Sequence, residues 1–224
     1  MIPVLVEGKS GSGKTYSLKN FKPNEIGVIS VEKGRLPFRT EIKCVKVPTS
    51  FEGCKDYATL YRMKYAWIFN AIKSSKCKSL AIDDSQYLLA NELFDRANEK
   101  GYEKFTQMAA NFRGLIHAIN ESDIEDKIVY FLHHTEIDAD GREKAKTIGK
   151  MLDEKLTVEG CFDIVLYCND HKFYTQTNGQ STAKSPEDMF ELEIPNDLKA
   201  VDDAIREYYE IPREGGKDVE NKGD

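Results

Sequence analysis

Residues 8–15 read Gly8-Lys9-Ser10-Gly11-Ser12-Gly13-Lys14-Thr15, and this stretch decides the fold of the chain. It satisfies the pattern GxxxxGK[ST], directly follows the apolar run 2–6 and precedes a helical segment at 16–21. The glycines let the backbone curl so that successive amide hydrogens point at phosphate oxygens, and the start of a helix adds positive potential. The stretch therefore predicts a phosphate-binding P-loop for ATP, with Lys14 on the β- and γ-phosphates and Thr15 on Mg²⁺. Lys9 belongs to this loop, although the pattern does not require its side chain.

Short apolar runs alternate with helical patterns on the C-terminal side of this loop. Each run is rich in β-branched or aromatic residues, as buried strands are. The predicted strands are residues 2–6, 26–31, 79–82, 128–132 and 162–167. Apolar residues recur at helical spacing within 57–72 and 105–119, which predicts amphipathic helices there. The alternation predicts an α/β fold of the P-loop nucleoside triphosphatase type, in which helices cover a mostly parallel central sheet.

The C-terminal part of the chain has a different pattern. Residues 171–177 alternate in polarity and Asn178-Gly179 is a favoured turn, which predicts a β-hairpin within about residues 162–195. A short helix is predicted at 200–209. Residues 213–224 are charged and lack apolar anchors, so we expect a flexible tail there and a single domain over residues 1–212.

Composition narrows the class of protein. Of the 224 residues, 40% are hydrophobic and 31% are charged, as in a globular protein with one core. The formal net charge of −6 argues against coating of duplex nucleic acid by bulk electrostatics, although a local basic strip remains compatible with DNA. No apolar run approaches the roughly 18 residues of a membrane span, so we expect a cytoplasmic protein without a membrane partner. The five cysteines are scattered and never spaced as CxxC, which favours idle thiols over metal or redox chemistry.

Acidic residues end two of the predicted strands. Asp83 and Asp84 follow the run 79–82, where a carboxylate reaches the magnesium side of the P-loop from a neighbouring strand. Asp83 is the first choice as the magnesium ligand, and Asp84 is the alternative. Glu32 follows the run ending at Val31 and is predicted to orient or deprotonate the attacking water. Glu7, which precedes the loop, is predicted to be structural.

Two histidines follow the strand at 128–132. His133 and His134 lie at the same predicted sheet edge, where a side chain can sense the γ-phosphate. His134 is favoured over His133, and a zinc site is disfavoured because adjacent strand residues point to opposite faces. Lys14, Glu32 and His134 form the predicted catalytic set.

A basic strip follows the histidines. It consists of Arg142, Lys144, Lys146 and Lys150. These cations either contact DNA phosphates or supply a finger to the nucleotide site of a neighbouring subunit. Acidic residues such as Glu143 and Asp153 are interleaved with these cations, so a third interpretation is that the strip is simply a solvated surface without a partner.

Several segments together resemble the phage-encoded P-loop ATP-binding proteins with a RecA-like core, which include ATP-dependent single-strand annealing proteins. The resemblance spans about residues 2–209 and rests on GKSGSGKT, SVEKG with Glu32, LAIDDSQYL, FLHHTE followed by KTIGKMLDEKL, TQTNGQSTAKSPEDMF and IPNDL. It implies a RecA-like core, ATP hydrolysis, and a homo-oligomer, either a ring or a filament, with nucleotide sites near subunit interfaces. It further implies action on single-stranded DNA in phage recombination or replication, with phage or host proteins as partners in the host cytoplasm. The doubled acid Asp83-Asp84 and the lack of extra domains depart from full recombinases, so independent strand exchange is not expected.

Two further functions compete with this one. The first is an ATP-gated adaptor that loads a partner such as a helicase and hydrolyses little ATP alone. The second is a small-molecule kinase, which the lack of an Arg-rich lid segment disfavours. The sequence leaves open the number of subunits, the length and polarity of any bound DNA, and whether hydrolysis is needed for function.

Overall fold

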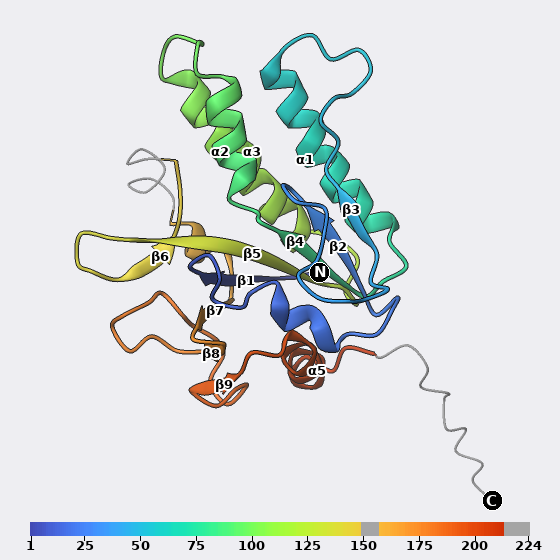
Figure 1. The fold of residues 1–224 in the computed structure, drawn as a ribbon, viewed down its shortest axis with the longest axis vertical. Coiled ribbons are helices and arrows are strands. Elements are labelled where there is room, and N and C mark those ends of the chain that lie inside the picture. The colour runs from blue at the N-terminus through green and yellow to red at the C-terminus, as the bar shows by residue number, and fades with distance from the viewer. Residues whose placement is uncertain (149–156, 213–224) are drawn as a thin grey trace, which may run out of the picture.

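The computed structural model describes residues 1–148 and 157–212, and Figure 1 shows a central sheet with helices on both faces. The strands are β1 (Ile2–Gly8), β2 (Ile26–Ser30), β3 (Cys44–Lys46), β4 (Ser79–Asp83), β5 (Ile128–Ile137), β6 (Glu143–Ala145), β7 (Ile164–Asn169), β8 (Lys172–Tyr174) and β9 (Glu193–Pro195). The helices are α1 (Tyr57–Ser74), α2 (Tyr87–Asp95), α3 (Glu103–Asn120), α5 (Leu198–Tyr208) and the 3₁₀ helices η1 (Tyr16–Asn20) and η2 (Val158–Cys161). Helices α1 to α3 lie on one side of the sheet, and α5 lies with η1 on the other (Figure 1).

The strand order confirms the predicted α/β fold. It runs β3-β2-β4-β5-β1-β7-β8-β9, and β6 pairs with β5. The strands from β3 to β7 pair in parallel, whereas β8 and β9 are antiparallel additions at one edge. All five predicted strands therefore form the centre of the sheet. Strand β3 was not predicted, because a three-residue edge strand carries too little periodicity to read.

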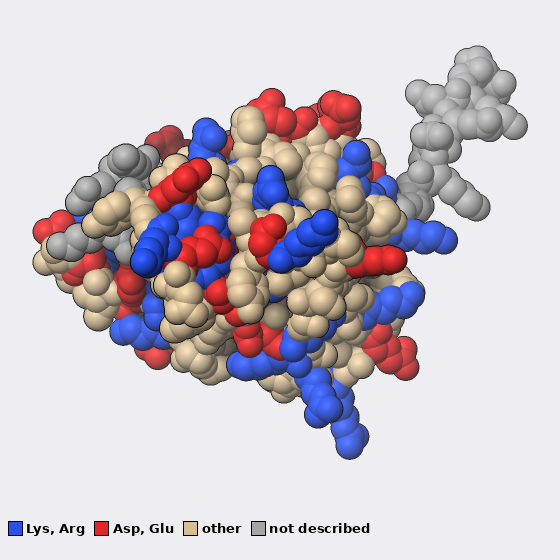
Figure 2. Space-filling model, turned by 90° about the horizontal axis from the view of Figure 1, so that it is seen from above, with Lys and Arg blue, Asp and Glu red and all other residues tan. Residues whose placement is uncertain are grey.

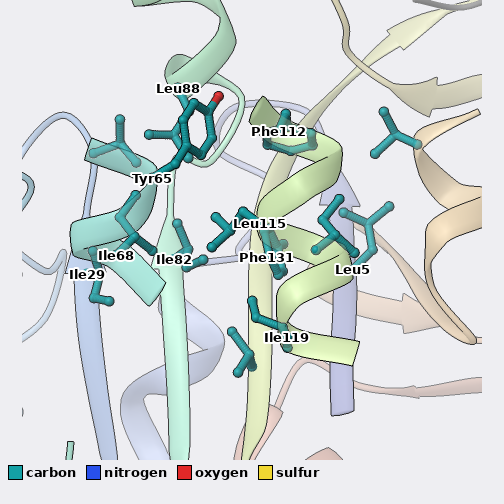
Figure 3. Close-up of a cluster of buried hydrophobic side chains, with 14 of the residues drawn as sticks. Leu5, Ile29, Tyr65, Ile68, Ile82, Leu88, Phe112, Leu115, Ile119 and Phe131 are labelled. Atoms are coloured by element: carbon teal, nitrogen blue, oxygen red, sulfur yellow. The ribbon is translucent and has the colours of Figure 1, made fainter. Parts of the chain in front are cut away.

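The core forms two layers because alternate strand residues face opposite sides. On the side of α1 to α3, Phe131 of β5 packs among residues of the helices (Figure 3). The labelled residues of this layer are Leu5, Ile29, Tyr65, Ile68, Ile82, Leu88, Phe112, Leu115, Ile119 and Phe131. On the other side, Tyr130 and Leu132 pack in a second cluster with Leu18 of η1 and Ile205 of α5. The predicted apolar stripes of both amphipathic helices are thus core packing, except at Tyr57, which is 49% exposed.

The helical segment predicted at 16–21 is a 3₁₀ helix that ends at Asn20. Its bonds include Leu18 N–H to Thr15 C=O at 3.3 Å, and Phe21 is already extended. Pro23 prevents the helix from continuing further, because a proline disfavours helical geometry in the residue before it, Lys22, and cannot donate a backbone hydrogen bond. A helix of five residues contributes little dipole, so anion binding here depends on the loop amides and on Lys14.

The predicted hairpin exists, but its turn was assigned wrongly. Strands β7 and β8 are joined by Asp170 and His171, whose φ angles are 46° and 57°. Asn178-Gly179 instead lies in a loop closed by the Thr177 hydroxyl, which donates to the Ser181 carbonyl at 2.6 Å. The favoured turn dipeptide forms no hairpin because β8 ends at Tyr174 and pairs with β9, about twenty residues further on.

Three predictions lie wholly or partly outside the described residues: the role of Lys150, the segment KTIGKMLDEKL from 149 onwards, and the tail at 213–224. Within the described residues, no helix combines the length and apolarity needed to cross a membrane.

Candidate active site

The phosphate loop joins β1 to η1 and is packed against the C-terminal part of the chain. A Cβ at Gly8 would lie 2.4 Å from the Cys168 carbonyl oxygen of β7. A Cβ at Gly13 would lie 2.3 Å from Asn196 Nδ2, and the φ of Gly13 is 108°. Asn196 Nδ2 also donates to the Gly13 carbonyl at 3.0 Å. Glycine is therefore required at both positions. Asn196 holds the end of the loop, a role that the sequence did not indicate, since Asn196 was noted only as part of the segment IPNDL.

Lys14 is enclosed by its own loop. Its Nζ donates to the carbonyl oxygens of Gly8 at 2.6 Å and Lys9 at 2.7 Å. Burial lowers the pKa of the Lys14 ammonium to about 8, and nearby thiol and carboxyl groups partly offset this effect. A buried ammonium is suited to charge-assisted hydrogen bonds with phosphate oxygens, and the role of Lys14 on the β- and γ-phosphates stays a prediction.

Thr15 meets Asp83 across the sheet. The Thr15 hydroxyl donates to Asp83 Oδ1 at 2.7 Å, although β4 and β1 are separated by β5. Burial raises the pKa of Asp83, while the Thr15 hydrogen bond opposes that rise. A hydroxyl and a carboxylate are the hard oxygen ligands that Mg²⁺ prefers, so the donor set fits a Mg²⁺ ion completed by phosphate and water. Within the described residues, no three His, Cys, Asp or Glu side chains group as a metal site.

Asp84 contacts His134 rather than Thr15, and its carboxylate also lies near enough to Lys14 to favour the charged ammonium. Its φ is 60°, which redirects the chain after β4, and its Oδ1 lies 3.5 Å from Nε2 of His134. The structure thus places Asp83, rather than Asp84, beside Thr15.

The two histidines have different surroundings. His133 is fully buried, with Nδ1 at 2.9 Å from the Ser85 hydroxyl and Nε2 at 2.8 Å from the Lys146 carbonyl. His134 pairs in register with Gly8, and its side chain is 22% exposed. Burial and the charge of Lys14 lower the pKa of His134 to about 4, so the ring is neutral at physiological pH. His134 is therefore the histidine that remains accessible, while His133 is a structural residue.

Glu32 lies in a small pocket between the end of β2 and the helices α1 and α2. The pocket has a volume of about 110 Å³ and is lined in part by Thr49, Tyr61 and Tyr87. Glu32 Oε1 accepts a hydrogen bond from Asn91 Nδ2 at 2.5 Å. The sequence pattern did not indicate Asn91, because it lies on the unpredicted helix α2. The role of Glu32 as the base stays a prediction.

The described basic residues Arg142, Lys144 and Lys146 lie on or directly after the hairpin formed by β5 and β6. Arg142 forms ion pairs with Asp138 and Asp140, both at 3.2 Å, and Lys144 lies 3.6 Å from Glu136. Lys146 is exposed, and its backbone binds the strand that carries the histidines. Acidic neighbours therefore offset much of the charge of the described part of the strip.

Three buried glutamates lie beside the loop, a cluster that sequence reasoning missed. Glu7 Oε1 accepts from the Thr182 hydroxyl at 2.7 Å, and Glu159 Oε1 accepts from the Ala145 amide at 2.7 Å. Glu143 Oε1 pairs with Lys9 Nζ at 2.7 Å, so the variable loop lysine is anchored to β6. Burial, with Glu159 and Glu143 nearby, raises the pKa of Glu7 to about 8 despite the Thr182 hydrogen bond. Glu7 is therefore protonated at neutral pH, in line with its predicted structural role.

Replacing Glu7 with glutamine is expected to stabilise the protein increasingly as the pH rises from about 5 to 8. The folded state holds the Glu7 proton up to a pKa of about 8, whereas the unfolded state releases it near 4.5. The wild type therefore loses stability across this window, by roughly 1 kcal/mol per pH unit, and the neutral amide does not. Urea unfolding of both proteins at several pH values measures the difference, with the exposed Glu52→Gln as control. Parallel curves for wild type and Glu7→Gln would contradict the raised pKa.

Comparison with known proteins supports a nucleotide site here. Residues 2–190 match the sequence model of a protein family described as AAA domain. A search of curated proteins finds no match to this chain.

Proposed function

The chain belongs to the AAA domain family of P-loop ATPases, and from this premise we propose that it hydrolyses ATP with Mg²⁺ and couples hydrolysis to single-stranded DNA. The observation that carries the first half is the contact between Thr15 Oγ1 and Asp83 Oδ1 at 2.7 Å, next to the buried ammonium of Lys14. Hydroxyl, carboxylate and ammonium together provide the cation ligands and the positive charge that a triphosphate needs.

Each side chain of the site has a separate role in the proposed hydrolysis. The loop amides and Lys14 bind the phosphates, and Thr15 and Asp83 hold Mg²⁺, which neutralises charge on the phosphates when bound. Neutral His134 lies within β5, in register with Gly8, and can donate a hydrogen bond to the γ-phosphate. Glu32 orients the attacking water, and its hydrogen bond from Asn91 positions it.

The second half of the proposal depends on the link between the site and the hairpin of β5 and β6. The Lys146 carbonyl accepts from His133 Nε2 at 2.8 Å when that nitrogen carries the proton, and the Lys146 amide donates to the His134 carbonyl at 2.8 Å. A nucleotide-dependent shift of the histidines therefore reaches an exposed lysine directly. Together with the resemblance to phage single-strand annealing proteins, this link supports a phage protein that acts on single-stranded DNA as a homo-oligomer in the host cytoplasm.

The ion pairs on the same hairpin favour a second candidate, an ATP-gated adaptor for a protein partner. Arg142 and Lys144 both have carboxylates within 4 Å. Figure 2 shows blue and red side chains interleaved over the face it draws, without a broad field of one sign. Such a surface suits a protein partner as well as a nucleic acid.

ATP hydrolysis measured with and without Mg²⁺ and a single-stranded oligonucleotide separates these functions. We expect hydrolysis that requires Mg²⁺ and rises severalfold with the oligonucleotide, with the rise lost at high salt. Lys146→Ala should reduce this stimulation and leave basal hydrolysis within about twofold, whereas exposed Lys22→Ala should change neither. Hydrolysis without any response to DNA would favour the adaptor, and no Mg²⁺-dependent hydrolysis would contradict the ATPase.

A further inference from the structure

An exposed aromatic ring directly follows the magnesium-binding end of the loop. Tyr16 is 41% exposed, although it lies next to the buried or half-buried residues 13–15. Its ring meets Phe38 at 6.1 Å and His171 at 6.4 Å between centroids, edge to face in both cases. Lys19 Nζ lies 4.4 Å from the ring centroid and covers one ring face. Residues from three separate segments thus orient a tyrosine whose ring remains accessible beside the phosphate loop.

His171 reaches this ring from a strained turn. Asp170 and His171 both adopt left-handed φ angles of 46° and 57° in the turn between β7 and β8, where glycine or asparagine is preferred. The turn lies against the loop, because a Cβ at Gly13 would come within 2.8 Å of His171 Nδ1. Non-glycine residues held in such conformations are concentrated at ligand sites. A histidine is therefore maintained over the end of the loop at a conformational cost that glycine would avoid.

The strand order sets the direction in which a nucleotide leaves the loop. Thr15 points to Asp83 on β4, so the magnesium and γ-phosphate end lies on the β5 and β4 side of β1. Strands β7 and β8 lie on the opposite side of β1. A triphosphate that spans the loop from the β4 side therefore directs its ribose and base toward β7 and β8. His171 stands on that side, in the turn between β7 and β8, and its ring meets that of Tyr16.

We propose that Tyr16, Phe38 and His171 form the nucleobase site, in which the base stacks on the exposed part of the Tyr16 ring beside His171. This inference rests on the proposed function and assigns a binding site to the base of the nucleotide, which the phosphate loop does not bind. Phe38 is half-buried and fixes the tilt of the Tyr16 ring through their edge contact. Stacking on an aromatic ring reads the π-face that every base has, so the site supplies affinity for a nucleotide over a bare polyphosphate.

Binding of ATP and of inorganic tripolyphosphate, which lacks the base, to the full chain tests this site. Tyr16→Ala is expected to weaken ATP binding about tenfold, as stacking energies suggest, and to leave tripolyphosphate binding within twofold. Tyr16→Phe should retain ATP affinity, because the ring is kept. His171→Gly, which relieves the strained turn, should weaken ATP severalfold without affecting tripolyphosphate. Phe94→Ala removes an aromatic that is 75% exposed on α2 and serves as the control.

The outcomes separate failure of this inference from failure of the proposed function. A wild type that binds tripolyphosphate as tightly as ATP would overturn the base site and leave the phosphate site standing. Equal losses of both ligands in Tyr16→Ala would assign Tyr16 to loop structure, which also overturns the base site. A wild type that binds neither ligand would overturn the proposed function and the base site together.

Discussion

ATP binding is expected to weaken by about a hundredfold or more when Lys14 is replaced by alanine. The ammonium lies inside the loop, with Nζ at 2.6 Å from the Gly8 carbonyl and 2.7 Å from the Lys9 carbonyl. In that position it supplies charge-assisted hydrogen bonds to phosphate oxygens, each worth roughly 1.5–3 kcal/mol, and no other described lysine is buried in the loop. Isothermal titration calorimetry with ATP and Mg²⁺ measures the loss.

The same substitution should leave the fold intact, because the buried ammonium is itself costly. Its pKa is lowered to about 8, so the charged form is less favourable in the folded state than in the unfolded state. The wild type should accordingly gain stability as the pH rises from about 8 toward 10.5, whereas Lys14→Ala should not. Exposed Lys22→Ala is the matched control for both measurements. Unchanged ATP affinity in a folded Lys14→Ala protein would remove Lys14 from the binding site.

Glu32→Gln is expected to retain ATP binding within a few-fold and to lower turnover by a factor of about 10²–10⁴. The amide keeps the size of the side chain and can still accept from Asn91 through its oxygen, but it cannot take a proton from water. Single-turnover hydrolysis measured beside ATP affinity separates chemistry from binding. Glu52→Gln, an exposed carboxylate on the loop before α1, provides the matched control.

Asn91→Ala extends this test to the position of Glu32. Loss of the hydrogen bond at 2.5 Å removes a restraint on Glu32 without removing its carboxylate, so turnover should change less than in Glu32→Gln. Undiminished hydrolysis in Glu32→Gln would exclude Glu32 as the base.

Much of the fold and part of the site could be predicted from the sequence, because the patterns that indicate them consist of residues close together in the chain. The phosphate loop consists of consecutive residues whose amides and side chains act together, so the pattern of residues 8–15 specifies it without reference to the rest of the chain. The five central strands are continuous apolar runs, which is how strands buried on both faces appear in a sequence. Asp83 could be expected near the loop because it ends such a run and parallel strands end at the same edge, and the structure brings it to Thr15.

Other features were decided by the tertiary structure. Asp83 contacts Thr15 and Asp84 contacts His134, and the chain is redirected at Asp84 by a left-handed φ of 60°, which the pattern of apolar residues does not encode. The contact of Asn91 with Glu32 joins residues 59 positions apart, and that of Asn196 with Gly13 joins residues 183 apart. The hairpin turn fell at Asp170 and His171, because pairing of β8 with β9 outweighed the preference of Asn178-Gly179 for a turn. The free-energy cost of breaking a local turn preference is small compared with the free energy gained when a whole strand is buried and paired. The order of the strands therefore determined which distant side chains meet, and the sequence does not state that order.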